Sequence, residues 1–500
     1  MVRQARTVWG ICIVVLTGIL LLPTAVRAQQ ASGIAGEVRD TSGALLPGVT
    51  VEAASPVLIE KVRSVVTDGQ GRYNIVELRP GTYVVTFTLA GFSTFRRDGI
   101  VLTAGFTAAV NADLQVGALT ETVTVTGASP LVDTQNVRQQ ASVSDELLSV
   151  LPSGSKGLMG LSRLVPGMSG SSDSGGGSGI YNANTAFATS IHGKGNGKLS
   201  YDGMQTNNQA ATGAMSYVMN PATVEEIVIL TGGISAESDA SGFLINLVPK
   251  EGGNVFKGGI DGTYANDHMQ SNNLSDRVRA TGVTEPSRVQ QLYDLNIYLG
   301  GPIKRDRLWF FAATRFAGSQ NGVAGIYFNK TRGTPFYTPD LDHPAFRKEW
   351  LKGQSARITW QVSPKNKVNG FSDTQSFQRR GSGGLQAPEA IVMRSFWPNG
   401  LYQVTWTSPV TSKFLLEAGV SYAQNDFPNP REKSTDIFGF TVNETDISIL
   451  ETSTGLRYNA RDFYQPVNEQ DRYVERFAAS YVTGSHAFKT GFQLQQGVVN

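Results

Sequence analysis

Residues able to do chemistry occur along this 500-residue chain, but their spacings complete no catalytic or metal site. The glycine-rich run at Gly193 lacks two residues of a phosphate-binding loop, because His192 and Leu199 stand where a glycine and a Ser or Thr belong. Ser153 and Lys156 form a bare Ser-x-x-Lys pair without the companion motifs of penicillin-binding enzymes. None of the four histidines has a His or Glu at metal-ligand spacing. The sequence therefore predicts no catalysis, no metal and no cofactor.

Charge and cysteine content narrow the function further. The chain has 43 basic and 41 acidic residues, a net charge of +2, and no basic run stands out. Nucleic acid is therefore not an expected partner. The single cysteine, Cys12, lies near the N-terminus. Once that segment is removed, the chain can form no disulfide and offers no thiolate to a substrate or metal.

The N-terminus has the pattern of a secretory signal peptide. Arg3 and Arg6 precede an apolar stretch over residues 8–22, and Ala28 ends a small-residue cleavage site. We expect residues 1–28 to be removed on export, the alternative being a retained anchor.

The elements that dominate the second half are strands joined by short turns. Tyr402, Val404 and Trp406 alternate with polar neighbours, and residues 356–373 repeat the pattern. One face of each strand is then apolar and the other polar, which is typical of an outer-membrane β-barrel with lipid outside. We predict roughly nine strands in residues 251–500, with a long polar loop over 316–350. A soluble β-sandwich is the competing interpretation.

Residues 29–117 read as a small all-β domain, because short strands recur with Gly or Pro between them. The segment resembles the carboxypeptidase regulatory-like domain, a prealbumin-type sandwich. The resemblance rests on these residues: Gly36, Glu37, Val38, Gly43, Leu46, Pro47, Gly48, Val49, Thr67, Asp68, Gly71, Arg72, Tyr73, Pro80, Gly81, Gly91 and Phe92.

A β-prone strip follows within residues 118–128. It consists of Glu121, Thr122, Val123, Thr124, Val125 and Thr126. Composition leaves two interpretations open. The strip is either the last strand of the sandwich or an unpaired segment to which a partner adds as an edge strand.

Residues 129–250 are mixed and less regular. Residues 144–148 look like a capped helix start, with Ser144 or Asp145 as the cap, and a Ser/Gly linker spans residues 170–179. Two apolar runs, at residues 224–230 and 243–248, are typical of buried strands.

In this order, the segments resemble TonB-dependent outer-membrane receptors of the Oar-like group. The matching motif positions are Ile191, His192, Gly193, Asp202, Gly203, Glu225, Glu226, Gly242 and Asn246. The chain departs from the family at His192, where Arg is usual, and at Phe243 and Pro249. The resemblance implies a plug over residues 129–250, a TonB box over 121–126 and gated transport rather than catalysis.

The implied location is the outer membrane of a Gram-negative-type bacterium. The implied partners are a TonB-type periplasmic energy-coupling protein, outer-membrane lipid and an extracellular ligand that the residues do not name. A barrel around such a plug needs about 22 strands, so we expect this chain to be the N-terminal part of a longer protein. The alternative function is a barrel-anchored adhesion or glycan-binding protein.

Overall fold

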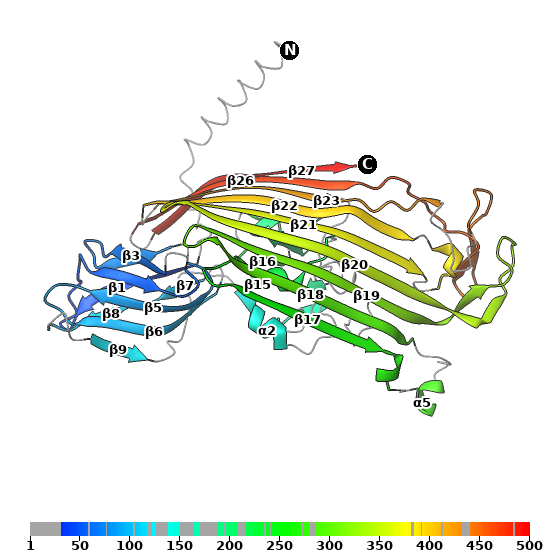
Figure 1. Ribbon diagram of the computed structural model, residues 1–500, viewed down its shortest axis with the longest axis horizontal. Coiled ribbons are helices and arrows are strands. Elements are labelled where there is room, and N and C mark those ends of the chain that lie inside the picture. Colours follow the sequence, from blue (N-terminus) through cyan, green and yellow to red (C-terminus); the bar gives the residue numbers. More distant parts are fainter. Residues whose placement is uncertain are drawn as a thin grey trace, which may run out of the picture.

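The computed structural model is built mainly of β-strands, which confirms the predicted all-β class. It describes residues 32–58, 61–76, 78–103, 106–117, 122–126, 139–150, 165–170, 189–193, 197–207, 217–234, 237–240, 242–271, 274–280, 287–381, 385–391, 393–411, 414–431, 441–483 and 486–500. The predicted signal peptide lies outside these residues. The strands form an N-terminal sandwich, a central domain and one large C-terminal sheet (Figure 1).

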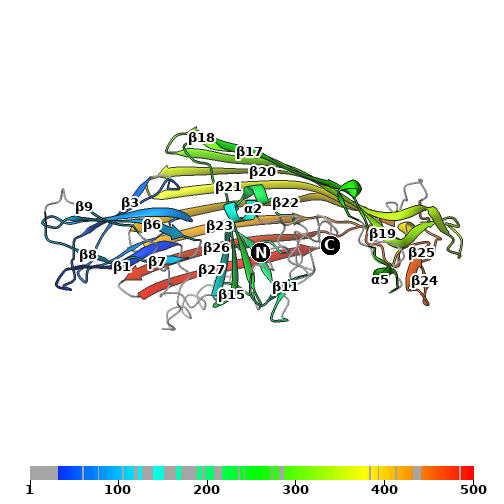
Figure 2. The same ribbon diagram turned by 90° about the horizontal axis from the view of Figure 1, so that it is seen from below.

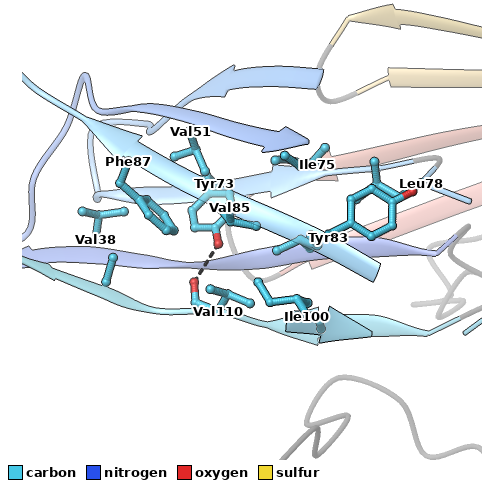
Figure 3. Close-up of a cluster of buried hydrophobic side chains, with 14 of the residues drawn as sticks. Val38, Val51, Tyr73, Ile75, Leu78, Tyr83, Val85, Phe87, Ile100 and Val110 are labelled. Atoms are coloured by element: carbon cyan, nitrogen blue, oxygen red, sulfur yellow. Dashed lines mark hydrogen bonds between the residues drawn. The ribbon is translucent and has the colours of Figure 1, made fainter. Parts of the chain in front are cut away.

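The N-terminal domain consists of two sheets packed face to face. The first contains β4 (Arg72–Ile75), β1 (Gly33–Asp40), β7 (Thr107–Ala109) and β8 (Ala112–Leu114). The second runs in the order β3 (Val62–Val66), β2 (Thr50–Ala54), β5 (Gly81–Thr88), β6 (Thr94–Leu102) and β9 (Thr122–Thr126). Alternate side chains point between the sheets and form the core shown in Figure 3. Within that core the Tyr73 hydroxyl donates to the Val110 carbonyl at 2.7 Å, and burial raises the Tyr73 pKa.

The central domain spans residues 139–250 and has one mixed sheet. Its strand order is β10 (Gln139–Ser144), β15 (Val224–Gly232), β16 (Leu244–Pro249), β13 (Lys198–Tyr201) and β14 (Met204–Gln205). Beside it lie the pair β11 (Met168–Gly170) and β12 (Thr189–Ile191), the helix α2 (Asp145–Val150) and the turn η3 (Pro221–Thr223). The predicted cap is present, because the Leu147 N–H donates to the Ser144 hydroxyl at 3.3 Å. Both predicted buried strands are confirmed as β15 and β16.

The C-terminal sheet, called the wall below, is an antiparallel meander. Its nine strands among the described residues are β17 (Lys257–Asn266), β18 (Val289–Lys304), β19 (Leu308–Asn329), β20 (Pro339–Ser363), β21 (Asn366–Gly381), β22 (Arg394–Thr411), β23 (Phe414–Asn425), β26 (Gln470–Thr483) and β27 (His486–Val499). The longer connections hold η4 (Asp267–Met269), α5 (Asp276–Arg279), η5 (Pro388–Ala390), β24 (Ile449–Glu451) and β25 (Leu456–Tyr458). These strands make a single sheet, as a barrel wall requires, rather than two packed layers.

No helix among the described residues is long and apolar enough to cross a membrane.

The alternation predicted from sequence is confirmed in the wall. On β20, Ile358 and Trp360 are 49% and 43% exposed on the outer face, whereas Arg357 and Thr359 are buried on the inner face. Val404 of β22 is likewise exposed on the outer face. The apolar side chains therefore face outward and the polar ones inward.

The predicted loop over residues 316–350 is wrong. β19 continues to Asn329 and β20 begins at Pro339, so only residues 330–338 connect them. The strands extend beyond the apolar belt, and there polar outward residues such as Lys348 break the apolar face, although Ile326 and Phe328 are still buried. Alternation disappears from the sequence at that point although the hydrogen-bonded ladder continues.

The three parts have a simple arrangement (Figures 1 and 2). The central domain lies against the inner face of the wall. The N-terminal domain lies at the end where the wall strands are joined by short turns, and the long connections lie at the opposite end. In outer-membrane β-barrels in general, short turns lie on the periplasmic side and longer loops on the outer side.

Candidate functional site

The predicted motif residues Asp202, Gly203 and Asn246 meet in one turn of the central domain. Asp202 and Gly203 form the β13–β14 turn, with positive φ values of 51° and 75°. The Asn246 side-chain oxygen accepts from the Gly203 N–H at 2.9 Å and from the Ser200 hydroxyl at 2.9 Å. These two hydrogen bonds fix the turn, so the carboxylate of Asp202 is held in a defined position.

That carboxylate is bound by the wall. Arg357 of β20 is 4% exposed, and its guanidinium donates to Asp202 at 2.7 Å and to Glu251 at 3.1 Å. Glu251 also forms an ion pair with Arg79 of the N-terminal domain, and it lies 4.0 Å from Lys367. A buried guanidinium is stable only when its charge is paired, so Arg357 depends on these two carboxylates. The cluster has members from the N-terminal domain, the central domain and the wall, and it therefore joins all three parts of the chain.

Further along the wall, polar side chains hold the backbone of the segment that precedes η3. Arg315 donates to the Met219 carbonyl at 2.7 Å and is itself paired with Asp294 at 2.7 Å. The Gln375 amide both donates to the Val218 carbonyl (2.6 Å) and accepts from the Val218 N–H (3.0 Å). These inward-facing side chains bind the central domain by hydrogen bonds to its main chain.

An apolar contact lies between these polar ones. The ring of Tyr201 stacks on Phe371 of β21 with centroids 4.6 Å apart. Leu401 and Ala423 of the wall join the same buried cluster. Burial raises the pKa of Tyr201, so its hydroxyl stays neutral.

The remaining predicted motif residues lie at separate places in the central domain. Ile191 is buried, whereas His192 and Gly193 form an exposed turn with positive φ. Glu225 is exposed, and Glu226 is buried and accepts a hydrogen bond from the Ser142 hydroxyl. These five residues do not converge with the Asp202 turn.

The departure at Phe243 has a physical explanation. Phe243 follows Gly242, is fully buried, and its ring lies over Gly197. A Cβ on Gly197 would lie 1.9 Å from that ring. The large side chain is therefore accommodated by a glycine on the neighbouring segment.

Residues 122–126 of the strip form β9, the edge strand of the second N-terminal sheet. β9 pairs in parallel with β6, in unbroken register from Thr94↔Thr122 to Asp98↔Thr126. Its other edge pairs with no strand among the described residues, and Thr124 is exposed. Glu121 lies outside the described residues. The last-strand interpretation therefore holds for the backbone, and a partner-binding role for the same strand stays a prediction.

Sequence reasoning missed the residues that complete the site. Glu251, Arg79 and Gln375 are single polar residues far apart in the chain, and no periodic pattern marks them. Arg357 falls on the polar face of its strand, and nothing else in the sequence marks it. Among the described residues, no group of three or more His, Cys, Asp or Glu side chains could hold a metal ion.

Comparison with known proteins gives two findings. Residues 33–115 match the model of the carboxypeptidase regulatory-like domain. The TonB-dependent transporter Oar of Myxococcus xanthus is 31% identical over 310 residues, which is 60% of this chain and 28% of that protein. The chain thus spans well under two thirds of this relative's length.

Solved structures resemble the chain at low identity. The siderophore receptor PirA of Acinetobacter baumannii is 14% identical, with a TM-score of 0.46, over 72% of this chain and 48% of its own. The outer membrane transporter YddB of Escherichia coli is 12% identical, with a TM-score of 0.46, over 71% and 47%.

The chain therefore contains a carboxypeptidase regulatory-like domain and resembles the TonB-dependent transporter Oar over 60% of its length.

Proposed function

We propose that the chain is part of an outer-membrane transporter that binds an extracellular ligand and moves it past a plug with energy from a TonB-type periplasmic protein. The central domain is the plug and the wall is part of the barrel. The observation that carries the proposal is the seating of the central domain on the inner face of the wall by Arg357, Arg315 and Gln375. Side-chain contacts of this kind can break and re-form without unfolding either part.

The orientation of the N-terminal domain supports transport over adhesion. An adhesive or glycan-binding module would need to lie beside the long connections, on the outer side. The sandwich lies at the opposite, short-turn end (Figure 1). Its position instead suits contact with a periplasmic protein.

The strip is proposed to act through β9. Its unpaired edge can accept a strand from a partner, because main-chain hydrogen bonds give affinity with little demand on side chains. The partner either adds to this edge or takes the place of β6. In both cases a pull by the partner is passed to the plug through β9, because the plug follows β9 in the chain.

A cysteine at Thr124 tests the proposal. The predicted mature chain lacks cysteine, so Thr124→Cys in the full-length protein in cells offers one thiol on β9. We expect oxidation to give a disulfide-linked adduct with a TonB-type protein that carries cysteines along its own strand. The control, Thr41→Cys, places a thiol in an exposed turn of the same domain and should give none.

Proline substitutions separate the two modes of pairing. Successive N–H groups of a strand point to opposite edges, so Thr122→Pro and Val123→Pro, each combined with Thr124→Cys, remove a donor from different edges. We expect one of them to abolish the adduct and the other to release β9 from β6. Full adduct formation by both proline variants, or equal adducts at Thr41 and Thr124, would refute pairing through β9.

A further inference from the structure

The outer face of β20 changes character along its length. From Val362 to Ala356 its outward side chains are apolar, and Trp360 lies near the short-turn end. Lys352, Trp350 and Lys348 follow on the same face. Val362 and Lys352 are about ten residues apart, which is the length of a tilted strand that crosses the hydrocarbon layer. The lysines therefore lie where the lipid headgroups of the outer leaflet begin.

A hollow opens beside these lysines. Its volume is about 450 Å³, and Tyr264, Tyr293, Gln320 and Lys348 are among the residues that line it. Gly318 lies opposite Trp350 and lets the Tyr293 ring pack over its backbone, because a Cβ there would lie 2.4 Å from that ring. The hollow is therefore a feature of four adjacent strands.

The side chains around the hollow are held in place. The Trp350 indole N–H donates to the Gln378 side chain at 2.9 Å, and the Lys352 ammonium lies 5.5 Å from the Trp350 ring centroid. Lys348 is directly opposite Arg380 of β21, which adds positive charge. The aromatic rings are those expected at a membrane interface.

The charge of this face has one sign. Between Lys348 and Val362 on β20, and between Val368 and Arg380 on β21, no outward position carries a carboxylate. Glu349 borders the hollow, but it is buried and paired with Arg347 and Arg379. Lys348 and Lys352 form no ion pair with the described part of the chain. The surface lacks the counter-charge that a ligand would bring.

We propose that Lys348 and Lys352, with Trp350 and Tyr293, bind the phosphate-bearing headgroup of an anionic lipid in the outer leaflet. The inference rests on the proposed outer-membrane barrel. The ammonium groups pair with phosphate, the rings lie along the sugar or glycerol part, and the acyl chains continue over Ile358 and Trp360. The headgroup bridges β18 and β20 across β19 at the level where the apolar belt ends.

The test uses the full-length protein in phosphatidylcholine nanodiscs that contain a minor fraction of lipid A, a phosphorylated glycolipid. The variant Lys348→Gln/Lys352→Gln removes both charges, and Lys304→Gln/Lys365→Gln is the matched control at the short-turn end. Lipid A retained after detergent exchange is counted by native mass spectrometry. We expect about a tenfold lower retention in the first variant and wild-type retention in the control.

Three results would overturn the proposal. The first two are unchanged retention in the Lys348/Lys352 variant and equal losses in both variants. The third is release of lipid A by inorganic phosphate alone, at the same concentration that is needed when a dephosphorylated lipid competitor is added with it. The last would assign the site to a free anion. Failure of the wild-type protein to enter nanodiscs would refute the barrel itself, and is thus distinguishable from loss of headgroup preference in an inserted protein.

Discussion

Replacing Arg357 by Met should loosen the central domain from the wall. Met keeps much of the volume of the arginine stem and removes the guanidinium that binds Asp202 at 2.7 Å and Glu251 at 3.1 Å. Removing one partner of a buried ion pair costs about 3–5 kcal/mol. The Asp202 side chain is 22% exposed, so water replaces part of the lost interaction. We therefore expect about 3 kcal/mol, or about a 150-fold rise in local opening.

Hydrogen–deuterium exchange in residues 197–207 measures this opening. The amide of Asp202 donates to the Leu247 carbonyl at 3.0 Å, and that of Thr206 to the Leu199 carbonyl at 2.9 Å. Both should exchange faster in Arg357→Met, because exchange follows the free energy of local opening. The β15 amides, which are paired on both sides, should change less.

The control is Lys365→Met, in the exposed turn between β20 and β21. It removes a cation from the same end of the wall without touching the central domain. The reasoning is refuted if exchange in residues 197–207 is within about twofold of wild type in Arg357→Met. Equal acceleration in both variants would also count against it, since the effect would then be one of net charge.

Three further predictions concern the other contacts. Arg79→Gln should free the N-terminal domain from Glu251, and spin labels at Thr41→Cys and Lys365→Cys would show a broader distance distribution; an unchanged distribution would contradict the ion pair as a tether. Gly197→Ala should destabilise the central domain by about 1–3 kcal/mol through overlap with Phe243, and Phe243→Leu should restore part of the melting temperature; a wild-type melting temperature in Gly197→Ala would show that the overlap is relieved elsewhere. Burial, with Asp471 and Glu469 nearby, raises the pKa of Asp426 to about 6, above its unfolded value, so its stabilising contribution is present at low pH and is lost as the pH rises through about 6. The protection factors of amides in residues 426–431, which divide out the faster intrinsic exchange at higher pH, should therefore be lower at about pH 7.5 than at about pH 5, and Asp426→Asn should remove this difference; persistence of the difference would assign it to another group.

Local patterns in the sequence predicted much of the fold. The period-2 alternation at Tyr402, Val404 and Trp406 identified β22 and its outward face, because apolar outward side chains there alternate with polar inward ones. The runs at 224–230 and 243–248 identified β15 and β16, two neighbouring strands of the central sheet. Asp202, Gly203 and Asn246 were found through motif spacing, and the structure brings them together.

Long-range contacts were not predictable in this way. The Thr–Val strip suits a paired edge strand and an unpaired one equally, and only the register with Thr94–Asp98 shows where its backbone lies. Arg79, Glu251 and Arg357 are far apart in sequence, and each alone looks like an ordinary surface charge. Their meeting depends on how three separately folding parts dock, which no local pattern records.

The parallel pairing of β9 with β6 also determines how the N-terminal domain transmits force. β9 is the segment that joins the sandwich to the central domain, so tension between the two parts passes through it. Tension along the strand loads its ladder of hydrogen bonds together, in shear, whereas tension across the strand breaks them one at a time. The same five residues therefore resist a pull in one direction and yield to a pull in another. The direction of a pull on the sandwich would therefore decide whether the domain stays whole or releases its edge strand first.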